Sequence, residues 1–380
     1  MIERIGAPTE DVPAQWPATA PGLSLRGECE GAIDAPAAEA RPSVPRIAVV
    51  IPAYNVAAHI AGVLGGIPPF VSWVIVVDDG SLDDTAELVR GYAIGDPRVH
   101  LVAREVNGGV GAAVFSGYER ALKLGADIVV KMDGDGQMDP AYLGRLVTPI
   151  LLGQADYAKA NRFLHFGALG AMPPLRRLGN IGLSFLTKLS SGYWGVFDPT
   201  NGYTAIHATV IRELERSRIH ERYFFETSML LELGLARAVV RDVPIPARYG
   251  QEVSGLSELR ALRSFPGPLL RAFLRRILVL YFVRDFTLAS FYIVNGLWML
   301  LFALIWGAYH WALSVRTGLP ATTGTVMIAV LPLILGAQLL LQAASLDVQN
   351  VPQTPLSQNE GRATWDERTA GQGREGSGRW

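Results

Sequence analysis

Two long segments near the C-terminal end of the chain contain no Asp, Glu, Lys or Arg: residues 287–312 and residues 317–346. A bilayer core about 30 Å thick is crossed by about 20 helical residues, and both segments are longer than that. A buried core helix of a soluble protein is the alternative, but uncharged runs of that kind are usually only about 10–14 residues long. The sequence therefore predicts a transmembrane hairpin with spans over 287–312 and 322–346, joined by a short link.

Arginines before the hairpin indicate its orientation. Arg271, Arg275, Arg276 and Arg284 precede the first span, whereas the link holds only Arg316. Because positively charged residues are retained on the cytoplasmic side, we expect a multi-pass inner-membrane protein with two helices and with both termini in the cytoplasm.

The segment before the hairpin, residues 261–286, mixes arginine with apolar residues at helical spacing. This pattern predicts amphipathic helices at the membrane interface, in contact with anionic membrane lipid. A core helix whose arginines reach out to water is the alternative.

Charge and cysteine content exclude several classes of protein. With 34 Lys and Arg against 35 Asp and Glu the net charge is −1, so we expect no nucleic-acid partner. Cys29 is the one cysteine of the chain, which rules out a disulfide-stapled secreted scaffold. A disordered leader is predicted over residues 1–44, because they lack periodicity and an apolar signal-peptide core. A polar cytoplasmic tail is predicted over residues 347–380.

Between residues 45 and 260 the chain alternates between strand-like and helix-like patterns. Strands are predicted over 46–51, 73–77, 99–103 and 127–132, and helices over 57–65, 83–93 and 110–124. Repeated β-α-β units predict an α/β domain with a doubly wound parallel sheet, whose ligands bind at the carboxyl ends of the strands. Ser81 or Asp83 is the expected N-cap of the second helix.

An acidic loop directly follows the fourth predicted strand. Asp133 and Asp135 alternate with glycines there, and Gln137 adds a neutral oxygen. Two carboxylates this close repel each other unless a cation lies between them, and hard oxygen ligands select Mg²⁺ or Mn²⁺. A solvated turn is the alternative, but the position after a buried strand, with Asp78 and Asp79 at an earlier strand end, favours a metal site.

Four motifs occur in order between about residues 46 and 145: VVIPAYN, VVDDGSLDDT, NGGVGAAVFSGYERA and KMDGDGQMDP. Together they resemble family 2 glycosyltransferases. Later segments, DPTNGYTAI and FFETSMLLEL, are similar to the polyprenyl-phosphate sugar synthase branch, which includes dolichyl-phosphate mannose synthases. The resemblance implies a GT-A fold with a doubly wound mixed sheet, and a C-terminal membrane hairpin also occurs in that branch.

The resemblance further implies roles for individual residues. The implied nucleotide-sugar contacts are Pro52, Ala53, Tyr54, Asn55, Asp78, Asp79, Gly80, Asn107, Gly109, Asp133 and Gly134. The implied metal ligands are Asp133, Asp135 and Gln137, and the implied lipid-phosphate contacts are Arg162, Arg176 and Asn180. Glu226 would line the sugar or acceptor site and, with Asp133, Asp135, Arg162 and Arg176, completes the expected catalytic set.

Structural roles are the alternatives for two of these residues, since Arg162 could pair with a carboxylate of the sheet and Glu226 could cap a helix. Val56 and Asn180 depart from the family pattern, which often has Glu and Ser at these positions. The first departure puts one nucleotide contact in doubt, and the second allows a shifted acceptor pocket.

The function that the resemblance implies is an inverting, metal-dependent transfer of a hexose from a UDP- or GDP-sugar to polyprenyl phosphate, for cell-envelope glycan or protein glycosylation. A phosphate acceptor is already mostly anionic near neutral pH, so a site of Asp and Arg needs no catalytic His. A processive polysaccharide synthase is disfavoured because no Q-x-x-R-W motif occurs. An inactive membrane scaffold is disfavoured by the intact acidic motifs. The sugar, the choice of UDP or GDP, and a homo-oligomeric state stay open.

Overall fold

The computed structural model describes residues 44–162, 174–222, 224–246 and 265–358. The predicted leader before Val44 and the tail beyond Gln358 lie outside these residues.

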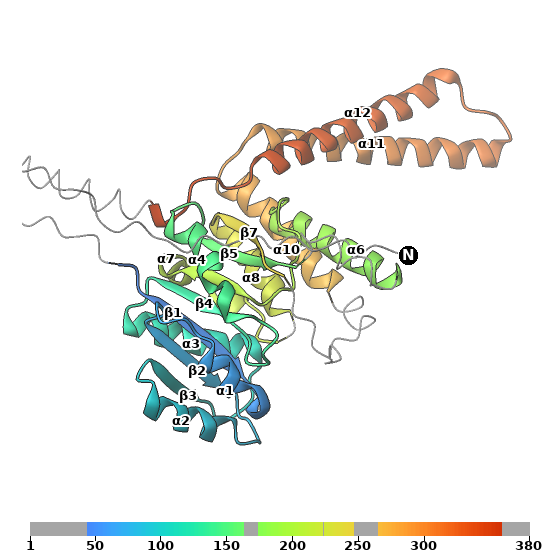
Figure 1. Cartoon of the computed structure of the whole chain (residues 1–380). Coiled ribbons are helices and arrows are strands. Elements are labelled where there is room, and N and C mark those ends of the chain that lie inside the picture. The colour runs from blue at the N-terminus through green and yellow to red at the C-terminus, as the bar shows by residue number, and fades with distance from the viewer. Residues whose placement is uncertain (1–43, 163–173, 223, 247–264, 359–380) are drawn as a thin grey trace, which may run out of the picture. The chain divides into compact units, whose positions relative to one another are not determined.

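One seven-stranded sheet forms the centre of the fold (Figure 1). Its strands are β1 (Ile47–Ala53), β2 (Trp73–Asp78), β3 (Val99–Ala103), β4 (Ile128–Lys131), β5 (Tyr157–Asn161), β6 (Thr204–His207) and β7 (Val240–Pro244). They are arranged in the order β3-β2-β1-β4-β6-β5-β7, and β6 runs antiparallel to both of its neighbours while the other pairs are parallel. The sheet is therefore mixed and doubly wound, and the four strands expected from the sequence are confirmed.

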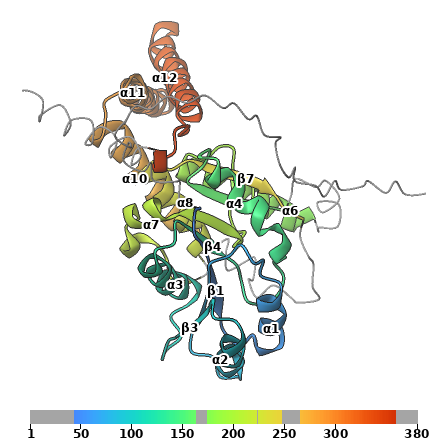
Figure 2. The same cartoon turned by 60° about the vertical axis from the view of Figure 1, so that its left-hand side comes forward.

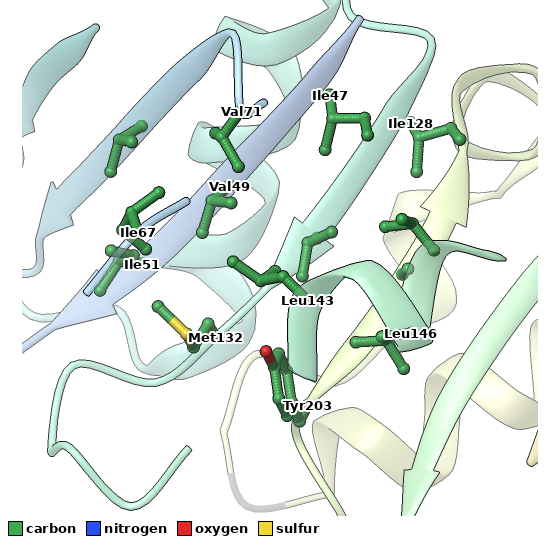
Figure 3. Close-up of a cluster of buried hydrophobic side chains, with 14 of the residues drawn as sticks. Ile47, Val49, Ile51, Ile67, Val71, Ile128, Met132, Leu143, Leu146 and Tyr203 are labelled. Carbon is green, nitrogen blue, oxygen red and sulfur yellow. The ribbon is translucent and has the colours of Figure 1, made fainter. Parts of the chain in front are cut away.

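Helices cover both faces of this sheet. One face packs on α1 (Ala57–Gly65), α2 (Thr85–Gly95) and α4 (Leu143–Leu151), and the other on α3 (Val110–Leu124), α7 (Ala208–Glu213) and α8 (Phe225–Ala236), as Figure 2 shows. Alternate residues of each central strand enter the two cores, so the strands read as continuous apolar runs. Figure 3 shows the first core, where Val49 of β1 lies near Leu143 of α4, and Ile51 and Leu146 belong to the same cluster.

The remaining elements lie around this domain. They are the 3-10 turns η1 (Pro140–Tyr142) and η2 (Arg216–Arg218), the helices α6 (Pro174–Ser191) and α10 (Pro266–Leu278), the π-helical turn η3 (Val279–Val283), and the two long helices α11 (Leu288–Thr317) and α12 (Thr323–Gln349). The last two are the only helices in the described ranges that are long and apolar enough to cross a membrane.

The long helices form the expected hairpin, side by side in Figure 1. Only 22% and 6% of their most apolar windows are buried, which is far less than a core helix of a soluble protein would show. Gly296 and Gly336 bring the two backbones together, because a Cβ on Gly336 would lie 2.9 Å from the carbonyl oxygen of Gly296. Small residues at such a crossing allow close packing where lipid gives no hydrophobic driving force.

The segment before the hairpin uses one side of α10 for packing inside the protein. Phe265 and Leu269 are buried in a small core with α6 and α8, and Arg276 is buried as well. This side fits the core-helix alternative. The other side exposes a stripe of leucines at positions 270, 274 and 278, so a membrane-interface role for α10 stays a prediction.

After α12 the chain returns to the sheet domain. The buried carboxylate of Asp156 accepts hydrogen bonds from the backbone N–H groups of Val239, Leu356 and Ser357 at 2.8, 2.9 and 3.1 Å. Both ends of the hairpin are thus tied to the same domain, as a two-span hairpin requires.

Replacing Asp156 with Ala should lower the free energy of unfolding by about 2–3 kcal/mol, because three amide donors lose a charged acceptor. The change is measured as the denaturant midpoint of the protein in detergent. Asp127→Ala is the control, since that carboxylate is half exposed and accepts one backbone N–H, from Arg46. Equal midpoints for the two variants would contradict the anchoring role of Asp156.

Candidate active site

The strand directions bring the loops of interest to one edge of the sheet. The carboxyl ends of β1, β2, β3 and β4 meet there because these strands are parallel. β6 is antiparallel to β4, so the segment that enters β6, residues 198–203, reaches the same edge, and β5 ends there at Asn161. The sequence patterns do not indicate the reversal of β6, although it places the 198–203 segment beside the acidic loop.

The loops after β1 and β2 hold each other in place. The backbone N–H of Asn55 donates to Ser81 Oγ at 3.0 Å, that of Ala57 to Asp83 Oδ2 at 3.1 Å, and that of Leu82 to Asn55 Oδ1 at 2.8 Å. The N-cap prediction is therefore wrong: the N-cap of α2 is Asp84. Ser81 accepts a donor from the loop after β1, and Asp83 accepts the N–H groups of Ala57 and Thr85, the first residues of α1 and α2. The structure leaves Tyr54 exposed at this edge, next to Pro52 and Ala53.

The second carboxylate of the Asp78–Asp79 pair organises the loop after β3. Asp79 is buried, and its oxygens accept the backbone N–H groups of Gly108 at 3.1 Å and Gly109 at 2.8 Å, while Arg104 Nε lies 2.9 Å from Oδ1. Asp78 is also buried and accepts the N–H of Ser81. Both carboxylates thus have partners inside the protein. Asp79 shapes the edge of the sheet indirectly, because it holds the backbone of Gly108 and Gly109 in place.

Glycine is required at two positions of these loops. Gly109 has a φ of 95°, and a Cβ there would lie 2.5 Å from the carbonyl oxygen of Glu221. Gly80 has a φ of 73°, and its Cβ would lie 3.1 Å from the backbone nitrogen of Asn107. The loops after β2 and β3 therefore approach each other so closely that a side chain at Gly80 would meet the backbone of Asn107.

The acidic loop after β4 places Asp133 and Asp135 on either side of Gly134. Asp135 Oδ1 accepts the backbone N–H of Gln137 at 3.0 Å, and Gly136 takes a φ of 78° in the turn. A Cβ on Gly134 would contact Val56, Ile51 and the carbonyl oxygen of Pro52 at 3.3–3.4 Å. The acidic loop therefore packs directly against the loop after β1, at Val56.

A buried lysine joins the acidic loop to α8. Lys131 Nζ lies 2.8 Å from Asp133 Oδ1 and donates to Glu226 Oε1 at 3.0 Å, and its side chain is 1% exposed. Burial by itself would lower the pKa of Lys131, but the carboxylates of Asp133 and Glu226 outweigh it, and the pKa lies above its usual value. Lys131 is not among the site residues predicted from the sequence. The signal was available, since a lysine inside the apolar strand DIVVKM needs a partner.

A second buried lysine fixes the segment before β6. Lys159 Nζ donates to the carbonyl oxygen of Asn201 at 2.6 Å, and burial lowers its pKa to about 8. Arg162 pairs with the buried carboxylate of Asp198, with Nε 2.9 Å from Oδ2, while 38% of the arginine side chain stays exposed. Burial alone would raise the pKa of Asp198, but Lys159 and Arg162 hold it below its ordinary value.

Two predicted acceptor residues are described only in part. Arg176 and Asn180 lie in the first two turns of α6, but their side chains lie outside the described residues. The structure therefore brings together the loops of residues 52–56, 78–81, 107–109 and 133–137 with Arg162 and Glu226, and gives only the backbone position of Arg176 and Asn180.

The donor set of the acidic loop fits a magnesium-type ion shared with a substrate. In the described part of the chain, no group of three or more His, Cys, Asp or Glu side chains is placed to hold a metal by itself. Two carboxylates are what a Mg²⁺ or Mn²⁺ site uses when substrate phosphates supply the other ligands. Asp133 and Asp135 supply two such carboxylates. They are too few to hold the ion without ligands from a substrate.

Comparison with known proteins gives a consistent family. The sequence model of Glycosyl transferase family 2 matches residues 48–215, which include the loops at the ends of β1 to β4 and the segment before β6. UDP-N-acetylglucosamine–dolichyl-phosphate N-acetylglucosaminyltransferase of Methanococcus voltae is 30% identical over 53% of this chain and 86% of that protein. Polyprenol monophosphomannose synthase of Mycolicibacterium smegmatis is 32% identical over 59% and 84%, and undecaprenyl-phosphate mannosyltransferase of Micrococcus luteus is 30% identical over 56% and 87%.

Proposed function

Because the chain belongs to glycosyltransferase family 2, in the branch of polyprenyl-phosphate sugar synthases, we propose that it transfers a hexose from a nucleotide sugar to polyprenyl phosphate, with inversion at the anomeric carbon. The observation that carries this proposal is the meeting of the acidic loop, the glycine-rich loops and Arg162 at one edge of a sheet domain that is tied to both ends of an apolar hairpin. The three relatives are named for dolichyl, polyprenol and undecaprenyl phosphate chemistry, which supports a lipid phosphate as the acceptor.

The donor nucleotide is proposed to bind over the ends of β1, β2 and β3. Residues 52–55 and 78–80 supply the surface of this site, and Asp79 holds the backbone of Gly108 and Gly109 against it. Asn107 lies in the same loop. The chemistry of these residues is compatible with a UDP- or a GDP-sugar.

The donor diphosphate is proposed to share a Mg²⁺ or Mn²⁺ ion with Asp133 and Asp135, and Gln137 lies in the same loop. Such an ion neutralises the charge that develops on the leaving nucleoside diphosphate. The protein itself contributes the fixed carboxylates, since Gly134 is packed against the loop after β1 and Asp135 is held by the N–H of Gln137.

The acceptor phosphate needs positioning more than deprotonation, because its second pKa is near 6. Arg162 is suited to this role, since Asp198 holds its guanidinium in place while 38% of the side chain stays exposed. Arg176 and Asn180 of α6 are proposed to complete the phosphate site. Glu226 is proposed to line the sugar.

The membrane arrangement follows the same proposal. The hairpin anchors the domain in the inner membrane, and the exposed leucines of α10 lie at the bilayer surface together with the exposed Ile181 and Phe185 of α6. Since α6 also carries Arg176 and Asn180, we expect the phosphate site to lie near the height of lipid headgroups. The positive-inside rule puts the domain and both termini in the cytoplasm.

The proposed function is tested with the purified full chain in vesicles that contain polyprenyl phosphate. A panel of labelled UDP- and GDP-hexoses is supplied with Mn²⁺ or Mg²⁺, and the lipid fraction is extracted and analysed. We expect one donor to give a lipid-linked sugar that is cleaved by mild acid. Label that appears only in water-soluble or polymeric products would contradict a polyprenyl-phosphate acceptor.

A further inference from the structure

A positively charged side chain occupies a core position beside the proposed site. Lys131 is the last residue of β4, and its side chain points to the face covered by α3 and α8, where Val129, two residues earlier, is part of the core. A buried ammonium group is costly unless it is paired and hydrogen-bonded. The carboxylates of Asp133 and Glu226 meet that need, at 2.8 and 3.0 Å from Nζ.

The two partners come from separate parts of the chain and belong to different sides of the site. Asp133 is a proposed metal ligand, whereas Glu226 lies 95 residues from Lys131, in the first turn of α8. Each carboxylate is partly exposed, Asp133 by 30% and Glu226 by 17%, so both also face the open edge. The ammonium of Lys131 lies behind them and joins them.

The position of the ammonium is fixed by its surroundings. A Cβ on Gly202 would overlap Lys131 Nζ and would lie 2.9 Å from Asp133 Oδ2, so the backbone before β6 closes over the pair. The ring of Phe225 lies below, with its centroid 6.0 Å from Nζ. The backbone at Gly202 and the ring of Phe225 therefore confine the Lys131 side chain to one position. In this position the ammonium group fixes the distance between Asp133 and Glu226.

We propose that Lys131 is a positioning residue that holds Glu226 beside Asp133 as a hydrogen-bond acceptor for hydroxyl groups of the donor sugar. This proposal rests on the proposed function and deepens it. A carboxylate only accepts hydrogen bonds, and bonds from hydroxyls to a charged acceptor are the stronger kind. With Asp133 on the diphosphate side and Glu226 on the sugar side, the lysine sets where the hexose lies relative to its own diphosphate.

A double-mutant cycle with Lys131→Met, Glu226→Gln and the combined variant tests this link. Each single change should lower kcat/KM for sugar transfer about 100-fold, as expected for a substrate displaced by about 1 Å. The combined variant should be no worse than the poorer single variant, because Lys131 acts through Glu226. Binding of the free nucleoside diphosphate with Mn²⁺, which lacks the sugar, should stay unchanged in Glu226→Gln. Lys123→Met, on the exposed last turn of α3, is the control.

Two results would overturn the positioning role. One is a combined loss of about 10,000-fold, which means that the two residues act independently. The other is full activity of Glu226→Gln. Thermal unfolding is measured on the wild type, the two single variants and the combined variant. Lys131→Met should lower the unfolding midpoint, and adding Glu226→Gln to Lys131→Met should restore part of the loss by removing an uncompensated charge. If the wild type transfers no sugar to lipid, the proposed function fails, and the presence or absence of this recovery still confirms or refutes the Lys131–Glu226 link.

Discussion

Replacing Asp135 with Asn is expected to lower the rate of sugar transfer to polyprenyl phosphate by about 1,000-fold. The amide keeps the size of the side chain, and its oxygen can still accept the backbone N–H of Gln137, so the fold of the loop is preserved. What is lost is one negative charge at the proposed metal site. Stabilisation of the leaving diphosphate by a bound metal is worth several kcal/mol, and about 4 kcal/mol corresponds to that factor.

The measurement is the initial rate of label transfer into the lipid fraction at saturating Mn²⁺, with membrane insertion checked by alkaline extraction. Asp139→Asn is the matched control, because it makes the same chemical change four residues later. Asp139 caps η1 through the N–H of Ala141, and Asn caps as well as Asp does. We expect the control to retain its rate within about twofold. An undiminished rate for Asp135→Asn would refute the metal assignment.

The first half of the fold was predictable from local pattern. Parallel strands buried on both faces must be continuous apolar runs, and β1 to β4 show this directly in the sequence. The rule that ligands bind at the carboxyl ends then selected the loops that the structure brings together. The second half of the sheet depends on a reversal, β6, whose burial pattern does not reveal its direction.

Long-range side-chain pairs were the main features that sequence reasoning did not give. Lys131 and Glu226 are 95 residues apart, and Asp79 reaches Gly109 across 30 residues. Such pairs depend on which helix covers which strand, and that is decided by packing of the whole domain rather than by spacing along one element. The lysine in an apolar strand was visible, but its partners were not.

The arginines before the hairpin show the same limit. Counting them predicts orientation, and the apolar residues between Arg275, Arg276 and Arg284 predict membrane contact. In the structure Arg275 pairs with Glu232 of α8, Arg284 donates to the carbonyl oxygen of Leu235, and Arg276 is buried. Helical periodicity gives a polar side and an apolar side, but it does not say whether the polar side meets lipid headgroups or a carboxylate of the same chain.

Arg276 gives the second large effect, which concerns the base of the hairpin. Its guanidinium makes a two-pronged ion pair with Asp347 near the end of α12, with Nη1 and Nη2 at 2.8 and 2.9 Å from the two oxygens, and Nη2 also donates to the carbonyl oxygen of Leu189 in α6. Tyr281 and Trp194 donate to the same carboxylate at 2.6 and 3.3 Å. This cluster therefore links the second long helix to α10 and to α6.

Arg276→Met should lower the free energy of unfolding by about 3–5 kcal/mol, because it leaves the carboxylate of Asp347 buried without its cation. The arginine and aspartate side chains are only 3% and 9% exposed, so water cannot replace the missing charge. Arg276→Met combined with Asp347→Leu should recover part of the loss, because it removes the buried uncompensated charge, although Tyr281 and Trp194 then lose their acceptor. Arg271→Met, on the exposed side of the same helix, should change stability by less than about 0.5 kcal/mol.

Unfolding is followed by circular dichroism in detergent, and transfer to polyprenyl phosphate in vesicles is measured on the same variants. Because α6 also carries Arg176 and Asn180, a hairpin that is no longer held to α6 should reduce transfer to the membrane-embedded acceptor more than it reduces binding of the nucleotide sugar. Recovery of both stability and transfer in the combined variant would show that the cluster acts by holding the hairpin in place. A stable Arg276→Met variant with normal transfer would show that the hairpin is positioned by other contacts, among them the tail residues held by Asp156.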